Sequence, residues 1–463
     1  MRTDRRQWYC LTVGGAGVVL LVVGMTALFP GAARAVAFDD LRHLLARTGF
    51  GLPDRRDIAR FADLTYPQTV DILLDEAQST PAPDEPDWGG YSDPAPIEWK
   101  SWDPERRKTF RVRQRQAGWL LKRWWVRQML NTPTPLRERM TLFWHNHFVS
   151  ALMKVKSPPL MLAQNQLLRR HALGNFADML RAIAVDPAML MYLDGRMNRK
   201  QNPNENFARE VMELFTLGDE KIYSEQDIKE AARAFTGWMI EPQTGAFVFR
   251  SNRHDAGEKN FLGQRGTFNG DDILAILLKQ PGTATFITTR LWREFVGTAP
   301  EPTTINRLAD QFRRSGYELR PLVQAILLSD QFHAATTPGN IVKSPVDMVV
   351  GTVRFFGPDR LDTGKVAKVL KNLGQDLFDP PNVKGWPGGT TWVTTASLAQ
   401  RLQILERSVR GLMGGSDMSM SRQFPIDDLT RLLLARPALT DLSGGHPVDR
   451  IRKLLLDPVF QVK

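Results

Sequence analysis

The chain has 463 residues and a formal net charge of +11, from 61 Lys and Arg against 50 Asp and Glu. This length suffices for one large or two ordinary domains with a sizeable core. The positive charge is spread along the chain, which suits an anionic envelope surface or an acidic polymer, so nucleic acid is not expected as a partner. The single cysteine, Cys10, excludes a disulfide-based fold and a thiolate metal site.

Residues 1–35 have the three parts of a signal peptide. The parts are a basic segment with Arg2, Arg5 and Arg6, an apolar run from Leu11 to Phe29, and the small-x-small triplet Ala33-Arg34-Ala35. This order predicts export to the periplasm or the extracellular space, with cleavage before Val36. The paired arginines favour the twin-arginine route over general export. An uncleaved signal anchor is the alternative, because roughly 20 apolar residues span a bilayer, and the membrane is expected as a partner only through this segment.

Helical periodicity and capping residues predict a mainly α fold with one large multi-helix globular domain. Helices are predicted over 39–49, 65–78, 104–130, 134–148, 202–218, 224–235, 271–280, 284–296, 303–315, 319–332, 344–356 and 393–410. Residues 79–103 and 374–392 are rich in Pro, Gly and Trp and are predicted to be irregular.

One small β-hairpin is predicted between Ala246 and Leu262, where residues 247–249 alternate briefly. Gly414-Gly415-Ser416 begins a Met- and Ser-rich linker, after which two short amphipathic helices follow. The predicted organisation is therefore a helical core domain over 36–410, then a linker and a C-terminal helical extension over 411–463.

The segment 202–218 is predicted to be one amphipathic helix that places four polar side chains on one face, beside an apolar stripe. These side chains are Asn206, Arg209, Glu210 and Glu213. Polar groups next to a core-facing stripe are costly unless they form a network or a site. We expect Glu210, Glu213 and Arg209 to be catalytic and Asn206 to contact substrate. The alternative is a structural stripe in which Glu210 and Glu213 form ion pairs with Arg209 and, from the next helix, with Lys229, Arg233 or Glu230.

His145 and His147 are candidate metal ligands in a chain that holds seven His in all. Residues two apart on a continuous helix differ by about 200° in direction, so both can bind one ion only if the helix ends near His145. The alternative is one core histidine and one surface histidine.

His254 and Asp255 are further candidate metal ligands, with Gly257 allowing a tight turn and Lys259 as a candidate substrate contact. The alternative is a turn in which Asp255 bonds its own backbone.

The loop with Lys384, Trp386 and Trp392 offers a cation and two indoles, and Lys384 and Trp386 are predicted to contact substrate. The alternative is a hydrophobic plug that locks the last helices onto the core. The chain has no His-Glu-x-x-His, no phosphate loop, no Gly-x-Ser-x-Gly and no paired Glu-x-x-His, which excludes several common enzyme classes.

Seven segments, in order over about residues 40–405, together resemble the bacterial family called domain of unknown function 1800. They are residues 44–51, 140–148, 204–218, 231–238, 254–259, 343–346 and 382–389. The resemblance implies an exported, mostly helical protein. It also implies a partner, since members often neighbour a gene for an exported protein of alkaline-phosphatase-like fold. It brings no established activity and no catalytic residues.

Two functions remain as expectations. The first is a metal-dependent hydrolase in which the His, Asp and Glu clusters hold a divalent ion that activates water, with one Glu as general base and Arg209 holding an anionic substrate group. The second is a non-enzymatic envelope protein that contacts a glycan or a partner exported protein through the Trp386 loop.

Overall fold

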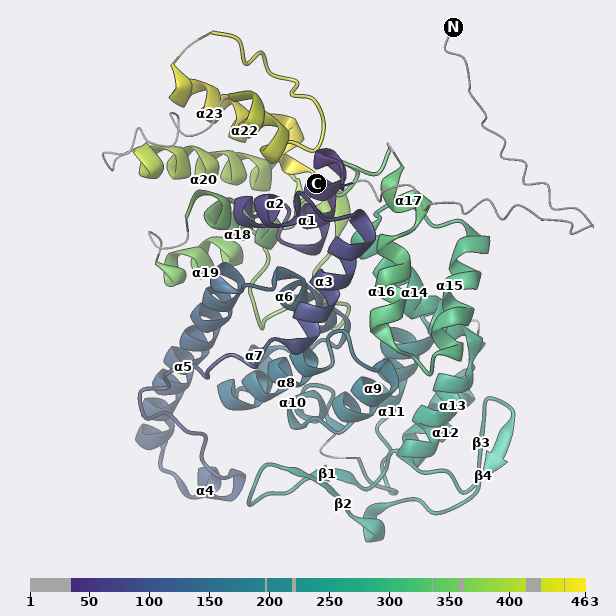
Figure 1. The fold of residues 1–463 in the computed structure, drawn as a ribbon. Helices are drawn as coiled ribbons and strands as arrows, with labels where there is room; N and C mark the ends of the chain where they lie inside the picture. The colour runs from purple at the N-terminus through teal and green to yellow at the C-terminus, as the bar shows by residue number, and fades with distance from the viewer. Residues whose placement is uncertain are drawn as a thin grey trace, which may run out of the picture. The chain divides into compact units, whose positions relative to one another are not determined.

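Helices make up nearly all the regular structure of the chain (Figure 1). The structure is a computed structural model, and it describes residues 35–463 except 196–197, 219–221, 335, 358–361, 414–425 and 445. The first 34 residues of the predicted signal peptide and the Gly414-Gly415-Ser416 linker start lie outside the described residues. Among the described helices, none is long and apolar enough to cross a membrane.

The N-terminal third contains α1 (Phe38–Thr48), α2 (Arg55–Phe61), α3 (Tyr66–Ser79), α4 (Pro96–Ser101), α5 (Pro104–Asn131) and α6 (Pro135–His147). The start of α3 follows from its sequence, because Thr65 and Gln68 form a reciprocal capping box. The segment 79–103, predicted to be irregular, contains the short helix α4. Helix α6 is buried along almost its whole length, so the polar side chains that it carries lie inside the core.

Four helices follow: α7 (Leu152–Val155), α8 (Pro158–Arg170), α9 (Phe176–Ala184) and α10 (Pro187–Tyr192). Each of α8, α9 and α10 begins with a side-chain cap, from Ser157, Asn175 and Asp186 respectively. In Figure 1 these helices lie below α6, and α8 packs against it.

The segment predicted to be one helix over 202–218 consists of two. An α-helix, α11 (Glu205–Glu210), is capped by Asn204 and continues as the π-helix η2 (Val211–Leu217). Gly218 ends it with a φ of 71°, a left-handed conformation that glycine adopts without strain. The wider turn of a π-helix changes which side chains share a face, so the predicted polar stripe does not stay together.

The small β-structure differs in its pairing from the prediction. Strand β2 (Phe247–Phe249) pairs with β1 (Trp238–Ile240), which precedes it, and a second hairpin joins β3 (Lys259–Phe261) to β4 (Gln264–Gly266). The 3-10 turn η4 (Ser251–Arg253) connects the two hairpins. Local alternation identified β2, but it does not show which segment pairs with it. Helix α12 (Glu225–Ala234) precedes β1 and has the predicted Ser224–Asp227 capping box.

The later helices are α13 (Gly270–Lys279), α14 (Pro281–Phe295), α15 (Pro302–Arg314), α16 (Leu319–Leu327), α17 (Asp330–His333), α18 (Pro345–Phe356), α19 (Thr363–Asn372), η6 (Gly389–Trp392), α20 (Thr395–Met413), α22 (Ile426–Leu433), α23 (Pro447–Leu456) and η7 (Pro458–Gln461). The predicted helix 319–332 is interrupted where Ser329 caps α17. Helix α19 was not predicted, while α22 and α23 match the two short closing helices.

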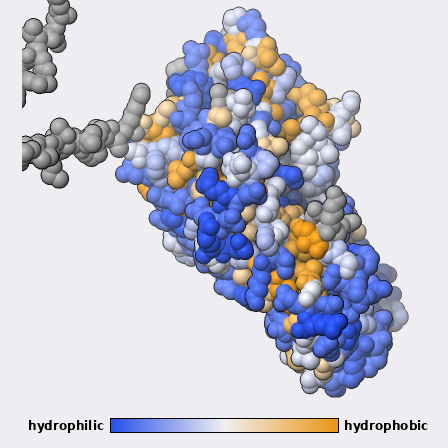
Figure 2. Space-filling model, turned by 90° about the vertical axis from the view of Figure 1, so that its right-hand side faces the viewer, coloured by the Kyte–Doolittle hydropathy of each residue, from blue (hydrophilic) through white to orange (hydrophobic). Residues whose placement is uncertain are grey.

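One contiguous hydrophobic core joins most of these helices, and its largest fully buried side chains include Trp125, Trp144 and Trp292. On the face where α15 and the β3–β4 hairpin lie, hydrophilic residues dominate and apolar residues gather in small patches (Figure 2). Because this core is large, the burial of its apolar surface, at about 25 cal/mol per Å², is the main source of stability.

Buried ion pairs tie distant segments together inside this core. Asp347 on α18 bonds Arg139 on α6 and accepts a hydrogen bond from Lys463 Nζ at 3.0 Å. A backbone bridge between Val342 and Val462 lies beside this contact. The segment after residue 411 is therefore joined to the helical core through charged and backbone contacts.

Candidate functional site

Two of the predicted catalytic residues lie together with a predicted substrate contact. Glu213 Oε1 is 3.5 Å from Nζ of Lys384, which comes from the loop before η6. Glu210 lies one turn earlier and is only 9% exposed, yet its carboxylate accepts no hydrogen bond from any residue that the structure describes. Burial raises the pKa of Glu210, and the charge of Glu213 raises it further, while Lys384 and Arg209 oppose the shift.

The π-helix presents these carboxylates and is itself held at its end. Thr216 Oγ1 donates to the carbonyl of Val211, five residues earlier, at 2.7 Å. His147 Nε2 lies 3.2 Å from the carbonyl oxygen of Phe215. A carbonyl can only accept, so Nε2 carries the proton of the neutral ring and donates. His147 therefore satisfies a carbonyl that the helix leaves free near its end.

The loop that carries Lys384 is fixed by Asn146 on α6. Asn146 Oδ1 accepts from the backbone N–H of Trp386 at 2.6 Å, and a Cβ built on Gly385 would lie 2.2 Å from the same oxygen. Gly385 also has a φ of 86°, so both the space and the backbone conformation require glycine. This close approach places Lys384 opposite Glu213.

A second charged group lies near Tyr192, whose pKa Glu210 also influences. Lys122 Nζ donates to Asp376 at 2.5 Å and to Asp379 at 2.7 Å, and Asp379 also accepts from the backbone N–H of Met153. The charges of Glu210 and Asp379 both contribute, after burial, to a raised pKa of Tyr192 on α10. No sequence pattern indicates Tyr192 or Asp379, because neither lies in a polar stripe or motif.

His145 and His147 do not converge, because α6 continues through both. The ring of His145 is fully buried among Trp125, Phe378 and Trp386, and neither of its nitrogens has a hydrogen-bond partner among the described residues. Burial lowers the pKa of His145 to about 3. Burial lowers the pKa of His147 as well, so both imidazoles are neutral at physiological pH. Both histidines are core residues, whereas the packing alternative expected one at the surface.

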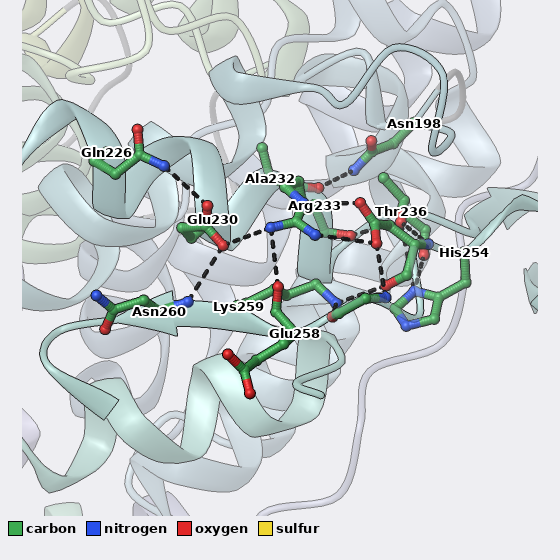
Figure 3. Close-up of polar contacts among 12 residues, drawn as sticks. Asn198, Gln226, Glu230, Ala232, Arg233, Thr236, His254, Glu258, Lys259 and Asn260 are labelled. Carbon is green, nitrogen blue, oxygen red and sulfur yellow. Dashed lines mark hydrogen bonds and ion pairs between the residues drawn. The ribbon is translucent and has the colours of Figure 1, made fainter. Parts of the chain in front are cut away.

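His254, Asp255 and Lys259 belong to a separate polar cluster around Arg233 on α12 (Figure 3). Arg233 bonds Asp255 and Glu230, each at 2.8 Å. Lys259 is 1% exposed, and its Nζ donates to the backbone oxygens of Asp255 and Gly257. Asp255 Oδ1 also accepts from the N–H of Gly257, which is the bond of the turn alternative. The cluster thus fastens the second hairpin to α12.

Within that cluster, His254 uses one ring nitrogen for hydrogen bonds to the residues that the structure describes. Its Nδ1 lies 2.9 Å from the carbonyl oxygen of Thr236, and Nδ1 donates because a carbonyl can only accept. The ring of Phe249 packs on it, at a centroid distance of 5.5 Å.

The other predicted site residues lie apart from Glu210. Arg209 forms an ion pair with Glu225 on α12 through two hydrogen bonds of 2.8 Å each. Arg209 is therefore ion-paired, as the structural alternative predicted, but Glu225 is not one of the partners that this alternative named. Asn206 is exposed and donates to the carbonyl of Leu193 at 3.4 Å. Trp386 and Trp392 are 4% and 7% exposed, as a hydrophobic plug requires, and neither ring has a face open for stacking on a sugar.

The described residues contain no group of three or more His, Cys, Asp and Glu side chains placed to hold one metal ion. Of the predicted metal and catalytic groups, the structure brings together Glu210 and Glu213. These carboxylates are the oxygen donors that a divalent ion could use beside Lys384.

Comparison with known proteins identifies the family of the chain. Residues 43–454 match the family model described as protein of unknown function, DUF1800. No curated protein and no solved structure matches the chain. Because the match covers most of its length, the chain belongs to the DUF1800 family.

Proposed function

We propose that this member of the DUF1800 family is an exported envelope hydrolase in which Glu210 is the general acid–base residue. The observation that carries the proposal is the buried Glu210 carboxyl, which has a raised pKa and no hydrogen-bond partner among the described residues, beside the ion-paired Glu213. Structural carboxylates are usually paired or hydrogen-bonded, because an unpartnered buried charge is costly. Two neighbouring carboxylates in unlike environments are the usual arrangement of an acid and a base.

The carboxyl groups of Glu210 and Glu213 have different surroundings, so each takes a different role in hydrolysis. Glu210, kept protonated more readily by burial, donates its proton to the leaving-group oxygen of an ester-like bond. Glu213, which is paired with Lys384, accepts a proton from the attacking water, whose oxygen forms the new bond. Lys384 has a side chain that is 72% exposed, so it can also bind an anionic group of the substrate.

A metal-dependent form of the same hydrolase remains part of the proposal. A divalent ion at this position would bind the carboxylates of Glu210 and Glu213 and lower the pKa of a bound water. The histidines of α6 are not needed in this form, because their rings face aromatic side chains.

The test is a hydrolysis screen on the purified mature protein, with chromogenic carboxyl esters, phosphoesters and glycosides, and with or without added divalent ions. Glu210→Gln should lose hydrolysis of any substrate that the parent cleaves. Glu205→Gln, on the same helix but exposed, is the matched control and should keep it. Equal rates in Glu210→Gln and the parent would remove Glu210 from the mechanism.

A further inference from the structure

The basic arm, defined as α4 and the first half of α5 (residues 96–116), is the most strongly charged segment that the site does not use. Its cations are Lys100, Arg106, Arg107, Lys108, Arg111, Arg113 and Arg115, and its acids are Glu98, Asp103 and Glu105. Figure 1 shows α4 and the start of α5 at one edge of the molecule, away from the helices that pack on the second half of α5. The positive charge of the chain is therefore concentrated here more than its sequence average indicates.

The cations of this arm are almost all without acidic partners. Among ion pairs between described residues, the arm makes one, between Lys108 and Glu105 at 3.8 Å. Arg106 lies over the ring of Trp102 at 4.2 Å, and Arg111 lies over the ring of Trp99 at 5.9 Å. Such stacking leaves the guanidinium charge uncompensated.

Aromatic side chains hold the arm in a fixed shape. Trp99, Trp102 and Tyr91 pack around Phe110 at centroid distances of 5.4 to 5.6 Å. This cluster keeps α4 against α5 although the cations on both helices repel one another. Repulsion of this kind is relieved when a polyanionic surface binds the arm.

One exposed apolar side chain lies on the arm, and another lies on the short helix attached to it. Val112 is 43% exposed on α5, and Met153 is 78% exposed on α7. Helix α7 is attached to the arm, because Gln114 donates to the carbonyl of Lys156, directly after α7. Cations that flank exposed apolar residues, with indoles nearby, characterise helices that lie in the headgroup layer of a membrane.

We propose that the basic arm docks the protein on an anionic phospholipid surface. The cations bind lipid phosphates, and Val112 and Met153 insert among the headgroups. An acidic polysaccharide would need the charge alone and gains nothing from the apolar residues, which is why the lipid surface is the favoured partner.

Docking through the arm would also place the Glu210 site close to the membrane. Helix α7 contacts both regions, because the N–H of Met153 donates to Asp379 at 2.8 Å and Lys154 Nζ lies 5.4 Å from the ring centre of Tyr192. The docking proposal does not depend on the hydrolase proposal, since binding is measured without a substrate.

The test is co-sedimentation of the purified mature protein with vesicles of phosphatidylcholine, with and without phosphatidylglycerol. The parent should bind only the vesicles that contain phosphatidylglycerol, and less at high salt. The variant Lys108→Gln/Arg111→Gln/Arg115→Gln, which removes three cations from one face of α5, should bind about 100-fold more weakly, the factor that corresponds to roughly 1 kcal/mol for each of three surface cations. These side chains are exposed, so the variant should fold like the parent.

A matched control removes three exposed arginines from α15, as Arg307→Gln/Arg313→Gln/Arg314→Gln. This control should bind vesicles like the parent. Equal losses in both triple variants would show a general charge effect and overturn the proposal. Binding to a soluble polyanion such as polyphosphate, without binding to anionic vesicles, would overturn it in favour of an acidic polymer.

Discussion

Asn146 and Trp386, 240 positions apart in the chain, are joined by two hydrogen bonds between one side chain and one backbone unit. Asn146 Oδ1 accepts from the N–H of Trp386 at 2.6 Å, and Nδ2 donates to its carbonyl at 3.5 Å. The pair connects the end of α6 to the loop that presents Lys384 to Glu213. The geometry of the candidate site therefore depends on an amide that takes no part in the proposed chemistry.

We expect Asn146→Ala to lower the free energy of unfolding by about 1–3 kcal/mol, because the buried N–H of Trp386 loses its acceptor. It should also reduce hydrolysis, since Lys384 is no longer held opposite Glu213. Denaturant unfolding and rate measurements check both effects. The control is Asn382→Ala in the same loop, whose side chain is exposed and, among the described residues, accepts from the N–H of Lys384 alone. Equal stability losses in the two variants would contradict this role of Asn146.

We expect Gly385→Ala to lower the free energy of unfolding more than most Gly→Ala substitutions in the chain. The new Cβ would lie 2.2 Å from Asn146 Oδ1, at a φ of 86° that side chains rarely adopt. Strain and overpacking together should cost about 2–5 kcal/mol. Gly388→Ala is the matched control, because a Cβ there meets no atom within 4 Å. Thermal unfolding of both variants measures the difference, and a stable Gly385→Ala would show that the Asn146 contact is not tight.

The sequence allows the helices to be predicted well where their ends carry a local code. Thr65 with Gln68 and Ser224 with Asp227 are capping boxes that depend only on residues three apart, and both helices start as predicted. The π-helix was not predictable, because its register depends on tertiary contacts such as the bond from His147 to Phe215. The partner of β2 was missed for the same reason, since alternation marks a strand and not its neighbour.

The sequence predicts individual residues of the candidate site but not which of them lie together. Glu210 and Glu213 were recognised from one helical face, and Lys384 from a separate loop, but nothing local shows that they meet. The rarity of histidine in the chain makes His145 a candidate metal ligand. In the structure, its ring is instead surrounded by aromatic residues from three segments. Composition could not show that burial.

The stability of Glu210→Gln should depend on pH in the direction set by the raised pKa. In the parent, the unfolded chain loses the proton of Glu210 near the ordinary value of 4.5, while the folded protein keeps it to higher pH. Folding stability is therefore lost as pH rises from 4.5 through the raised pKa, and is fully present below 4.5. Glu210→Gln has no carboxyl at this position and does not show this loss. As pH rises from 4.5 through the raised pKa, the free energy of unfolding of Glu210→Gln should therefore increase relative to that of the parent.

The control for this pH effect is Glu225→Gln, which should show the opposite sign. The bonds from Arg209 lower the pKa of Glu225, so its contribution is present above the ordinary value and is lost as pH falls through the lowered one. Urea unfolding of the parent and both variants at pH 3 and pH 7, on either side of the ordinary value, gives the comparison. A Glu210→Gln variant that is less stable than the parent at neutral pH would mean that the carboxylate is bonded and structural.

His147→Phe separates a structural role of this residue from a metal-binding role. Phenylalanine keeps a ring among Phe143, Phe148 and Phe286 but cannot donate to the carbonyl of Phe215. The unpaired carbonyl should cost about 1–3 kcal/mol of stability. Elemental analysis by mass spectrometry on the parent and the variant, purified from the exported fraction without chelators, should give the same metal content in both. A metal that is stoichiometric in the parent and lost from a folded His147→Phe would make His147 a ligand and contradict the assignment of the site to the two carboxylates.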